Sequence, residues 1–252
     1  MCPCDWSSRT TTANQPFERT FACELRSQAK VRSMVSLDTT MDDWLSPSYK
    51  HDKFDNPSFD DLVDVFEDLW SHYIFEPVRS LLAMPHGDIA AMAVLSSYFE
   101  AIESYRCGQS SKSRSRKFFV KGFGIVFRAD HPAIDDAAKA IYEHIRCGLA
   151  HQGMLTYKVQ YTRACPRAFL LTYPKLADGS LQIEAGVASI VVNPQRMYDG
   201  VTKHFEGYVS ALREGSNPSL CQAFKDTVHR QWALDQKYIV IGLPEEEFRG
   251  GV

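Results

Sequence analysis

The sequence predicts a mainly helical, α+β protein: an antiparallel helical bundle that carries a small β-sheet. Apolar residues recur three and four positions apart in several stretches between residues 58 and 153, which is the spacing of a buried helix face. Between residues 154 and 192 the pattern changes to short apolar runs interrupted by the turn-forming Asp178-Gly179, which is typical of strands. Helical spacing returns after Asn193-Pro194, so C-terminal helices are expected there.

The chain is expected to divide into four segments. Residues 1–57 have little apolar periodicity and are predicted to form a disordered or loosely packed leader. Residues 58–153 are predicted to form the helical core, and residues 154–192 an appended antiparallel β-meander. Residues 193–252 are expected to add C-terminal helices and a tail that complete the same domain, because 252 residues suffice for one core with an appendage.

Composition indicates an ordinary globular protein of the cytoplasm. The net charge is −3, so any contact with nucleic acid has to come from a local patch. The seven cysteines are scattered and odd in number, which suits reduced thiols. No apolar run approaches the roughly 18–20 residues of a membrane span, and no matching Cys/His pair accompanies Cys2 and Cys4. We therefore expect no membrane contact, no metal and no cofactor.

Four helices are predicted in the core. The first is capped by Ser58 with Asp61 three positions on, and Pro77 should kink or end it. The second runs from Asp88 to about Arg106, and Gly108 is its natural stop. The third is marked by phenylalanines at helical spacing, and the fourth follows Pro132. These phenylalanines are Phe118, Phe119, Phe123 and Phe127.

The end of the fourth helix presents two residues suited to chemistry, Arg146 and His151. Five steps on an ideal α-helix place their side chains roughly 140° apart, so one straight helix does not point both at one ligand. Two explanations are open. Either the helix distorts around the permissive Gly148, or a second copy of the chain completes the pair.

The segment Arg146-Cys-Gly-Leu-Ala-His151 resembles the Arg-x4–6-His signature of the HEPN superfamily, small helical domains of bacterial toxins, defence systems and RNA-processing factors. The preceding helix supports the likeness through Tyr98-Phe-Glu-Ala-Ile-Glu-Ser-Tyr105. The likeness covers roughly residues 58–213 and is to an uncharacterised bacterial branch. Cys147 stands where many active members carry Asn, Asp or His, and it is counted as a supporting residue.

The resemblance implies a homodimer in which Arg146 and His151 of both copies form one composite site. It implies a metal-independent endoribonuclease, with RNA as substrate and a possible antitoxin protein as partner. Histidine can accept and return a proton near neutral pH, and arginine holds phosphate oxygens with its charged fork. Attack of a 2′-hydroxyl on the adjacent phosphate would then leave a 2′,3′-cyclic phosphate and a 5′-hydroxyl.

Basic residues gather between Arg106 and Arg128, a stretch without any acid. This stretch is either a solvated loop or an arm that contacts phosphates. The nucleic-acid-binding candidates within it are Lys112, Arg114, Arg116, Lys117 and Lys121.

The roles of two acids, and a non-catalytic alternative for the whole chain, stay open. Glu100 and Glu103 are either solvated surface acids, or one of them orients Arg146. Arg146 alternatively serves only in a salt bridge and His151 only at the helix end, where positive charge is favourable. In that case the chain is a non-catalytic helical dimer that binds a nucleotide, a nucleic acid or a protein partner.

Overall fold

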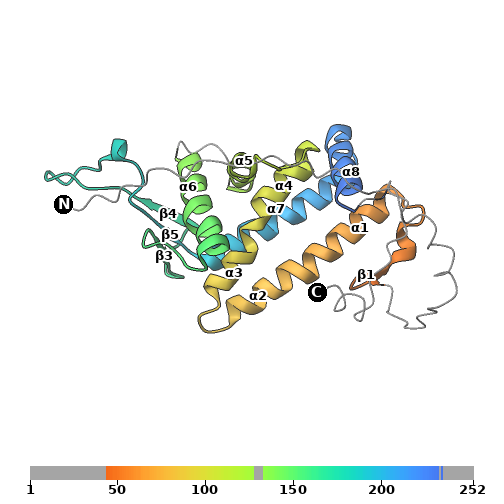
Figure 1. Cartoon of the computed structure of the whole chain (residues 1–252), viewed down its shortest axis with the longest axis horizontal. Helices are drawn as coiled ribbons and strands as arrows, with labels where there is room; N and C mark the ends of the chain where they lie inside the picture. The colour runs from red at the N-terminus through yellow and green to blue at the C-terminus, as the bar shows by residue number, and fades with distance from the viewer. Residues whose placement is uncertain (1–43, 128–132, 233, 235–252) are drawn as a thin grey trace, which may run out of the picture. The chain divides into compact units, whose positions relative to one another are not determined.

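The computed structural model describes residues 44–127, 133–232 and 234, and this part of the chain is mainly helical with two small sheets (Figure 1). The predicted dominance of helices is thus confirmed. Within the described residues, every helix falls short of the length and apolar character that a membrane crossing requires.

The first helical rod joins three segments without a break: α1 (Phe59–Trp70), the π-helical η2 (Ser71–Phe75) and α2 (Glu76–Ala83). Ser58 caps α1 as predicted, because its hydroxyl accepts a hydrogen bond from the Asp61 amide while the Asp61 carboxylate accepts one from the Ser58 amide. Pro77 lies in the first turn of α2. Proline lacks an amide donor, and the wider turn of η2 directly precedes it.

The second predicted helix is two helices, α3 (Asp88–Leu95) and α4 (Ser97–Cys107), which meet at Ser96. The hydroxyl of Ser96 donates to the carbonyl of Ala93, and that of Ser97 donates to the carbonyl of Val94. Serine hydroxyls compete with the backbone in this way and weaken helix continuity. Gly108 ends α4 in the left-handed conformation (φ +69°), as predicted.

The other half of the core contains α5 (Ser115–Phe127), α6 (Ile134–Ile141) and the π-helical η3 (Tyr142–Gln152). Helix α5 crosses α4 at very close range. A Cβ atom added to Gly122 would lie 1.8 Å from the carbonyl oxygen of Phe99. Glycine is therefore required at this crossing.

The small sheet contains β3 (Val159–Tyr161), β4 (Phe169–Thr172) and β5 (Ser189–Val192) in the order β3-β5-β4. Strand β5 is parallel to β3 and antiparallel to β4, so the predicted antiparallel meander is wrong. Ile190 and Val192 are fully buried, and the strand that carries them takes the central place. The apolar run at 181–184 predicts a further strand, but the structure has only a single bridge from Leu181 to Lys175, followed by the 3-10 turn η4 (Ile183–Ala185).

Two long helices, α7 (Pro194–Glu214) and α8 (Pro218–Trp232), complete the core. Phe66 of α1 lies at its centre, with ring centroids 5.5 Å from Phe205 of α7 and 5.2 Å from Phe224 of α8. Such aromatic contacts add to the burial of apolar area. The C-terminal helices thus share the core of the helical bundle. The apolar run at 238–243 predicts a terminal strand, and these residues lie outside the described part of the chain.

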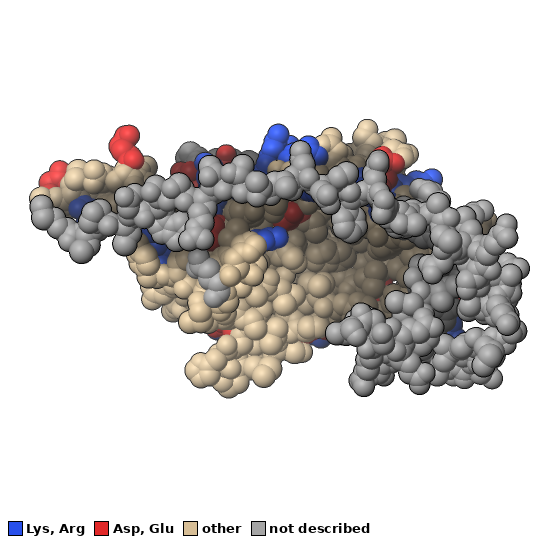
Figure 2. All heavy atoms as spheres, viewed as in Figure 1, with Lys and Arg blue, Asp and Glu red and all other residues tan. Residues whose placement is uncertain are grey.

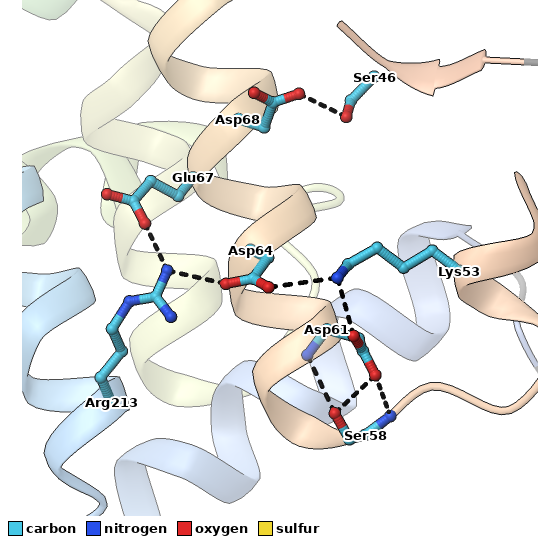
Figure 3. Close-up of polar contacts among 8 residues, drawn as sticks. All are labelled: Ser46, Lys53, Ser58, Asp61, Asp64, Glu67, Asp68 and Arg213. Atoms are coloured by element: carbon cyan, nitrogen blue, oxygen red, sulfur yellow. Dashed lines mark hydrogen bonds and ion pairs between the residues drawn. The ribbon is translucent and has the colours of Figure 1, made fainter. Parts of the chain in front are cut away.

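Residues 44–57, expected in the leader, pack on α1 through β1 (Trp44–Ser46), β2 (Tyr49–Lys50) and η1 (His51–Phe54). Figure 3 shows how this hairpin is held. Asp68 of α1 accepts a hydrogen bond from the Ser46 hydroxyl at 2.5 Å, which the figure draws. It also accepts hydrogen bonds from the amide and the hydroxyl of Ser48, at 2.9 and 2.8 Å. Burial raises the pKa of Asp68, but these hydrogen bonds outweigh it and hold the pKa below its usual value.

The hairpin has a second attachment to α1 in Lys53. Its amine lies 2.8 Å from Asp61 and 3.2 Å from Asp64, and Arg213 of α7 reaches Asp64 from the other side at 2.9 Å (Figure 3). This part of the predicted leader therefore belongs to the packed domain.

Candidate functional site

The end of the fourth predicted helix is distorted over its whole length. Residues 142–152 follow the π-helical pattern of η3, in which hydrogen bonds join residues five positions apart. Arg146 and His151 have this spacing, so the wider turn brings their positions toward one side of the helix. A Cβ added to Gly148 would lie 3.1 Å from the carbonyl oxygen of Met154, which leaves little space there for a side chain. The helix is therefore distorted, as the first of the two explanations for the pair requires.

Arg146 contacts an acid of a neighbouring helix. Its guanidinium nitrogen lies 3.5 Å from the Glu100 carboxylate on α4, and the two side chains are 31% and 19% exposed. Glu103, the other acid considered, pairs instead with Lys121 at 3.3 Å. Arg146 thus stays accessible at the surface. The contact with Glu100 uses one terminal nitrogen of the Arg146 guanidinium, so the other nitrogens can still bind an anion.

Two further residues connect this pair to α5. The Ser115 hydroxyl donates to the same Glu100 oxygen at 2.5 Å, and the Tyr142 hydroxyl donates to Ser115 at 3.2 Å. The guanidinium carbon of Arg146 lies 5.9 Å from the centroid of the Tyr142 ring, within the range of a cation–π contact. Residues of α4, α5 and η3 therefore meet in one polar cluster.

His151 and Cys147 lie on the same π-helical segment. His151 is exposed near its C-terminal end, just before Gly153, which has a left-handed backbone (φ +68°). Cys147 is a half-buried free thiol. An exposed imidazole can reach a bound substrate or a second copy of the chain.

A cavity of about 750 Å³ opens beside this cluster, and we call it the basic groove. Figure 2 shows lysine and arginine side chains gathered over α4 and α5. Four of the five predicted basic candidates line the groove, whereas Lys112 does not. The lining cations are Arg114, Arg116, Lys117, Lys121 and Lys139, and Ser113, Ser115, Val120 and Tyr142 complete the wall.

The cations of the groove differ in whether they already contact an acid or an aromatic ring of the chain. Lys121 and Lys139 each lie 3.3 Å from an acid, Glu103 and Asp136 respectively. Arg114 packs over the Phe118 ring. Arg116 and Lys117 are exposed, and among the described residues no acid pairs with either. These two are the cations most ready to contact a phosphate.

The backbone at the mouth of the groove has an unusual conformation. Ser113 has a positive φ of 63°, which is uncommon for a residue other than glycine. Such conformations cost free energy and concentrate at functional sites.

Ser115 and Tyr142 belong both to the groove and to the Arg146 cluster. Arg146 and His151 themselves do not line the groove, and Ser115 and Tyr142 are the residues that connect it to the Arg146 cluster. Sequence reasoning missed Ser115, Tyr142 and Lys139. A signal was present for the last two, because they precede Arg146 by four and seven positions, which is the spacing of one helix face.

The arrangement is suited to binding a phosphodiester: cations along a groove, a guanidinium beside it and an exposed imidazole on the same segment. Within the described ranges, no group of three or more His, Cys, Asp or Glu side chains is placed to hold a metal ion. No protein-family model, no curated protein and no solved structure matches the chain.

Proposed function

We propose that the chain is a metal-independent endoribonuclease of HEPN type, which binds RNA in the basic groove and cleaves it with Arg146 and His151. The observation that most supports this proposal is that two residues next to Arg146 and its partner Glu100 also line the groove. Tyr142 contacts Arg146, and Ser115 contacts Glu100, the partner of Arg146. Both residues also line the groove. We infer that a phosphate chain bound by Arg116 and Lys117 can extend past Ser115 and Tyr142 toward a third cation, Arg146.

In the proposed reaction, the 2′-hydroxyl of RNA attacks the adjacent phosphorus, and the bond to the 5′-oxygen breaks. His151 accepts the proton of the 2′-hydroxyl or donates one to the departing 5′-oxygen. Arg146 stabilises the negative charge that builds on the non-bridging oxygens. The products are a 2′,3′-cyclic phosphate and a 5′-hydroxyl.

Glu100 has a positioning role in this scheme. It holds the guanidinium of Arg146 at 3.5 Å, a long contact for an ion pair, while Ser115 satisfies the same carboxylate oxygen at 2.5 Å. An incoming phosphate can therefore draw the guanidinium away without leaving Glu100 bare. The HEPN resemblance adds a homodimer with both copies of Arg146 and His151 around one cleft, and a role in a toxin–antitoxin or defence system.

The first test is RNA cleavage by the full chain in the presence of EDTA. We expect unstructured RNA to be cut to products with 2′,3′-cyclic phosphate ends. Arg146→Ala and His151→Ala should each slow cleavage by about 100-fold or more, since one charge contact or one acid–base group contributes on that order. Arg146→Lys keeps the charge but loses the fork, and should cleave slowly while RNA binding persists.

Arg196→Ala is the matched control, because Arg196 is an exposed arginine of α7 with a single 4.0 Å contact to Asp199. It should cleave like the wild type. Cleavage that is unchanged in folded Arg146→Ala and His151→Ala variants would refute the catalytic assignment.

A second candidate function is RNA binding without cleavage. The basic groove favours it, because Arg116 and Lys117 can bind phosphates whether or not any reaction follows. This function predicts RNA binding that survives His151→Ala, together with intact RNA after incubation with the wild type.

A further inference from the structure

The connection between β4 and β5, residues 173–188, forms an arm that we call the β-arm. Figure 1 shows it reaching away from the helices, and residues 175–186 are all exposed. Main-chain hydrogen bonds nevertheless give it a defined hairpin structure. The Leu176 amide donates to the Ser180 carbonyl at 2.9 Å, and the Gln182 amide donates to the Pro174 carbonyl at 2.8 Å.

The turn of the β-arm is also built from specific residues. Asp178 accepts hydrogen bonds from the amide and hydroxyl of Ser180, and Gly179 has a positive φ of 87°. Such Asx-type turns with glycine are favourable local structures. The β-arm is thus ordered by its own hydrogen bonds and buries none of residues 175–186 against the rest of the described chain.

The β-arm exposes three large aliphatic side chains to solvent. Leu176, Leu181 and Ile183 are 46%, 58% and 63% exposed. A single exposed aliphatic side chain is ordinary, but a group of them on one short projecting element is typical of an interaction surface.

A complementary surface lies at the base of the β-arm. A pocket of about 390 Å³ opens beside β4. It is lined by Arg167 and by apolar residues of α5, α6 and β4, among them Phe127, Ile134 and Phe169. Strand β4 is at the edge of its sheet, and its outer side pairs with no strand in the described part of the chain. Edge strands of this kind accept an added strand from another chain.

We propose that two copies of the chain associate by exchanging β-arms, so that Leu181 and Ile183 of each copy enter the apolar pocket of the other. The pocket begins at the root of its own arm, since Tyr173 lines it, while residues 175–186 of that arm stay exposed. Glu184 lies next to Ile183, and its charge complements Arg167 of the pocket. The exchange is reciprocal, so one two-fold axis creates two identical contacts.

This inference rests on the surface of the β-arm and the pocket, and it stands whether or not the chain cleaves RNA. Its test is the molar mass in solution, which is measured without RNA. We expect the wild type to have twice the 28.6 kDa of one chain in light scattering coupled to size-exclusion chromatography.

The arm variant is Leu181→Asp with Ile183→Asp, and the pocket variant is Leu170→Asp. All three positions are exposed, so the variants should keep the wild-type circular dichroism. Each variant alone should be a monomer. An equimolar mixture should regain dimers, because the intact arm of the pocket variant fits the intact pocket of the arm variant.

Tyr157→Asp is the control, because Tyr157 is 93% exposed and lies outside the β-arm and the pocket. It should remain dimeric. A monomeric wild type, a dimeric arm variant, or a mixture of the two variants that stays monomeric would each overturn the exchange of β-arms. Arg167→Glu provides a second pocket variant that keeps the apolar lining, and it should weaken the dimer as well.

Discussion

At the scale of single residues, His204 shows how partial burial sets the charge of a side chain. It lies on α7 and its Nδ1 is 2.8 Å from the hydroxyl of Tyr98 on α4. Burial lowers the pKa of His204 to about 4, and the charge of Arg106 acts in the same direction. The imidazole is therefore neutral at neutral pH, and its Nδ1 shares a hydrogen bond with the Tyr98 hydroxyl.

This shift predicts a loss of stability in mild acid. The pKa of His204 is about 4 in the folded chain against an ordinary value of 6.5, so the unfolded chain binds more protons between these values. Protonation of His204 should then lower the free energy of unfolding by about 2 kcal/mol as the pH is lowered from about 7 to about 5. Urea denaturation at the two pH values measures it.

The variant His204→Asn separates this group from the other histidines. An asparagine amide can still hydrogen-bond to the Tyr98 hydroxyl as donor or acceptor, but it does not titrate. The variant should lose about 2 kcal/mol less than the wild type over the same pH interval. Equal losses in both proteins would show that His204 is not the titrating group.

At the scale of elements, the crossing of α4 and α5 determines the geometry of the candidate site, because Glu100 is on one helix and Ser115 on the other. Gly122 allows the two backbones to touch at Phe99. Gly122→Ala should lower the free energy of unfolding by about 2 kcal/mol or more, since the added methyl group meets a carbonyl oxygen rather than a flexible side chain. Thermal and urea denaturation report the change.

Gly207 of α7 provides the matched control. It is exposed, and a Cβ there meets nothing within 4 Å. Gly207→Ala should therefore raise the free energy of unfolding by up to about 1 kcal/mol, the helix-propensity difference between the two residues. Effects of the same sign in both variants would contradict the close crossing.

Short sequence patterns predicted where helices begin and end better than they predicted interruptions within the helices. The Ser58 cap and the Gly108 stop were predictable because each depends on neighbouring residues. The break at Ser96 and the π-helical segments depend on small differences between hydrogen-bond patterns, which apolar spacing does not reveal. The strand order was not predictable either, because the pairing of β5 with β3 joins residues about thirty positions apart.

At the scale of the whole molecule, charge is unevenly distributed: the chain has a net charge of −3, yet the groove is lined by cations. RNA affinity should therefore fall with salt concentration. Arg116→Ala and Lys117→Ala should each lower the slope of log affinity against log salt by about 0.7, the value for one phosphate contact on a single strand.

The salt series is best measured by fluorescence anisotropy in the His151→Ala background, so that the labelled RNA stays intact. Lys175→Ala on the β-arm removes an exposed lysine outside the groove and should leave the slope unchanged. The same slope in all variants would exclude the groove as the phosphate-binding surface.

The candidate site was predictable only where its residues are close in sequence. Arg114, Arg116, Lys117 and Lys121 fall within one basic stretch, and the structure places them on one groove. The sequence left open whether Glu100 or Glu103 contacts Arg146 or both acids are only solvated. The contact with Glu100 joins residues 46 positions apart, so it depends on how the helices pack. Ser115 joins them only because α4, α5 and η3 converge, which no local pattern encodes.

The hairpin that precedes α1 has a practical consequence for dissecting the molecule. Trimming the chain to the first long helix at residue 58 would remove every donor that Ser46 and Ser48 supply to Asp68, a carboxylate only 8% exposed. His72 would still lie 3.3 Å from this carboxylate, but a buried charge that loses three hydrogen bonds is costly, so such a fragment should be less stable. The packed unit therefore includes Ser46 and Ser48, and a boundary drawn from helical spacing alone cuts into it.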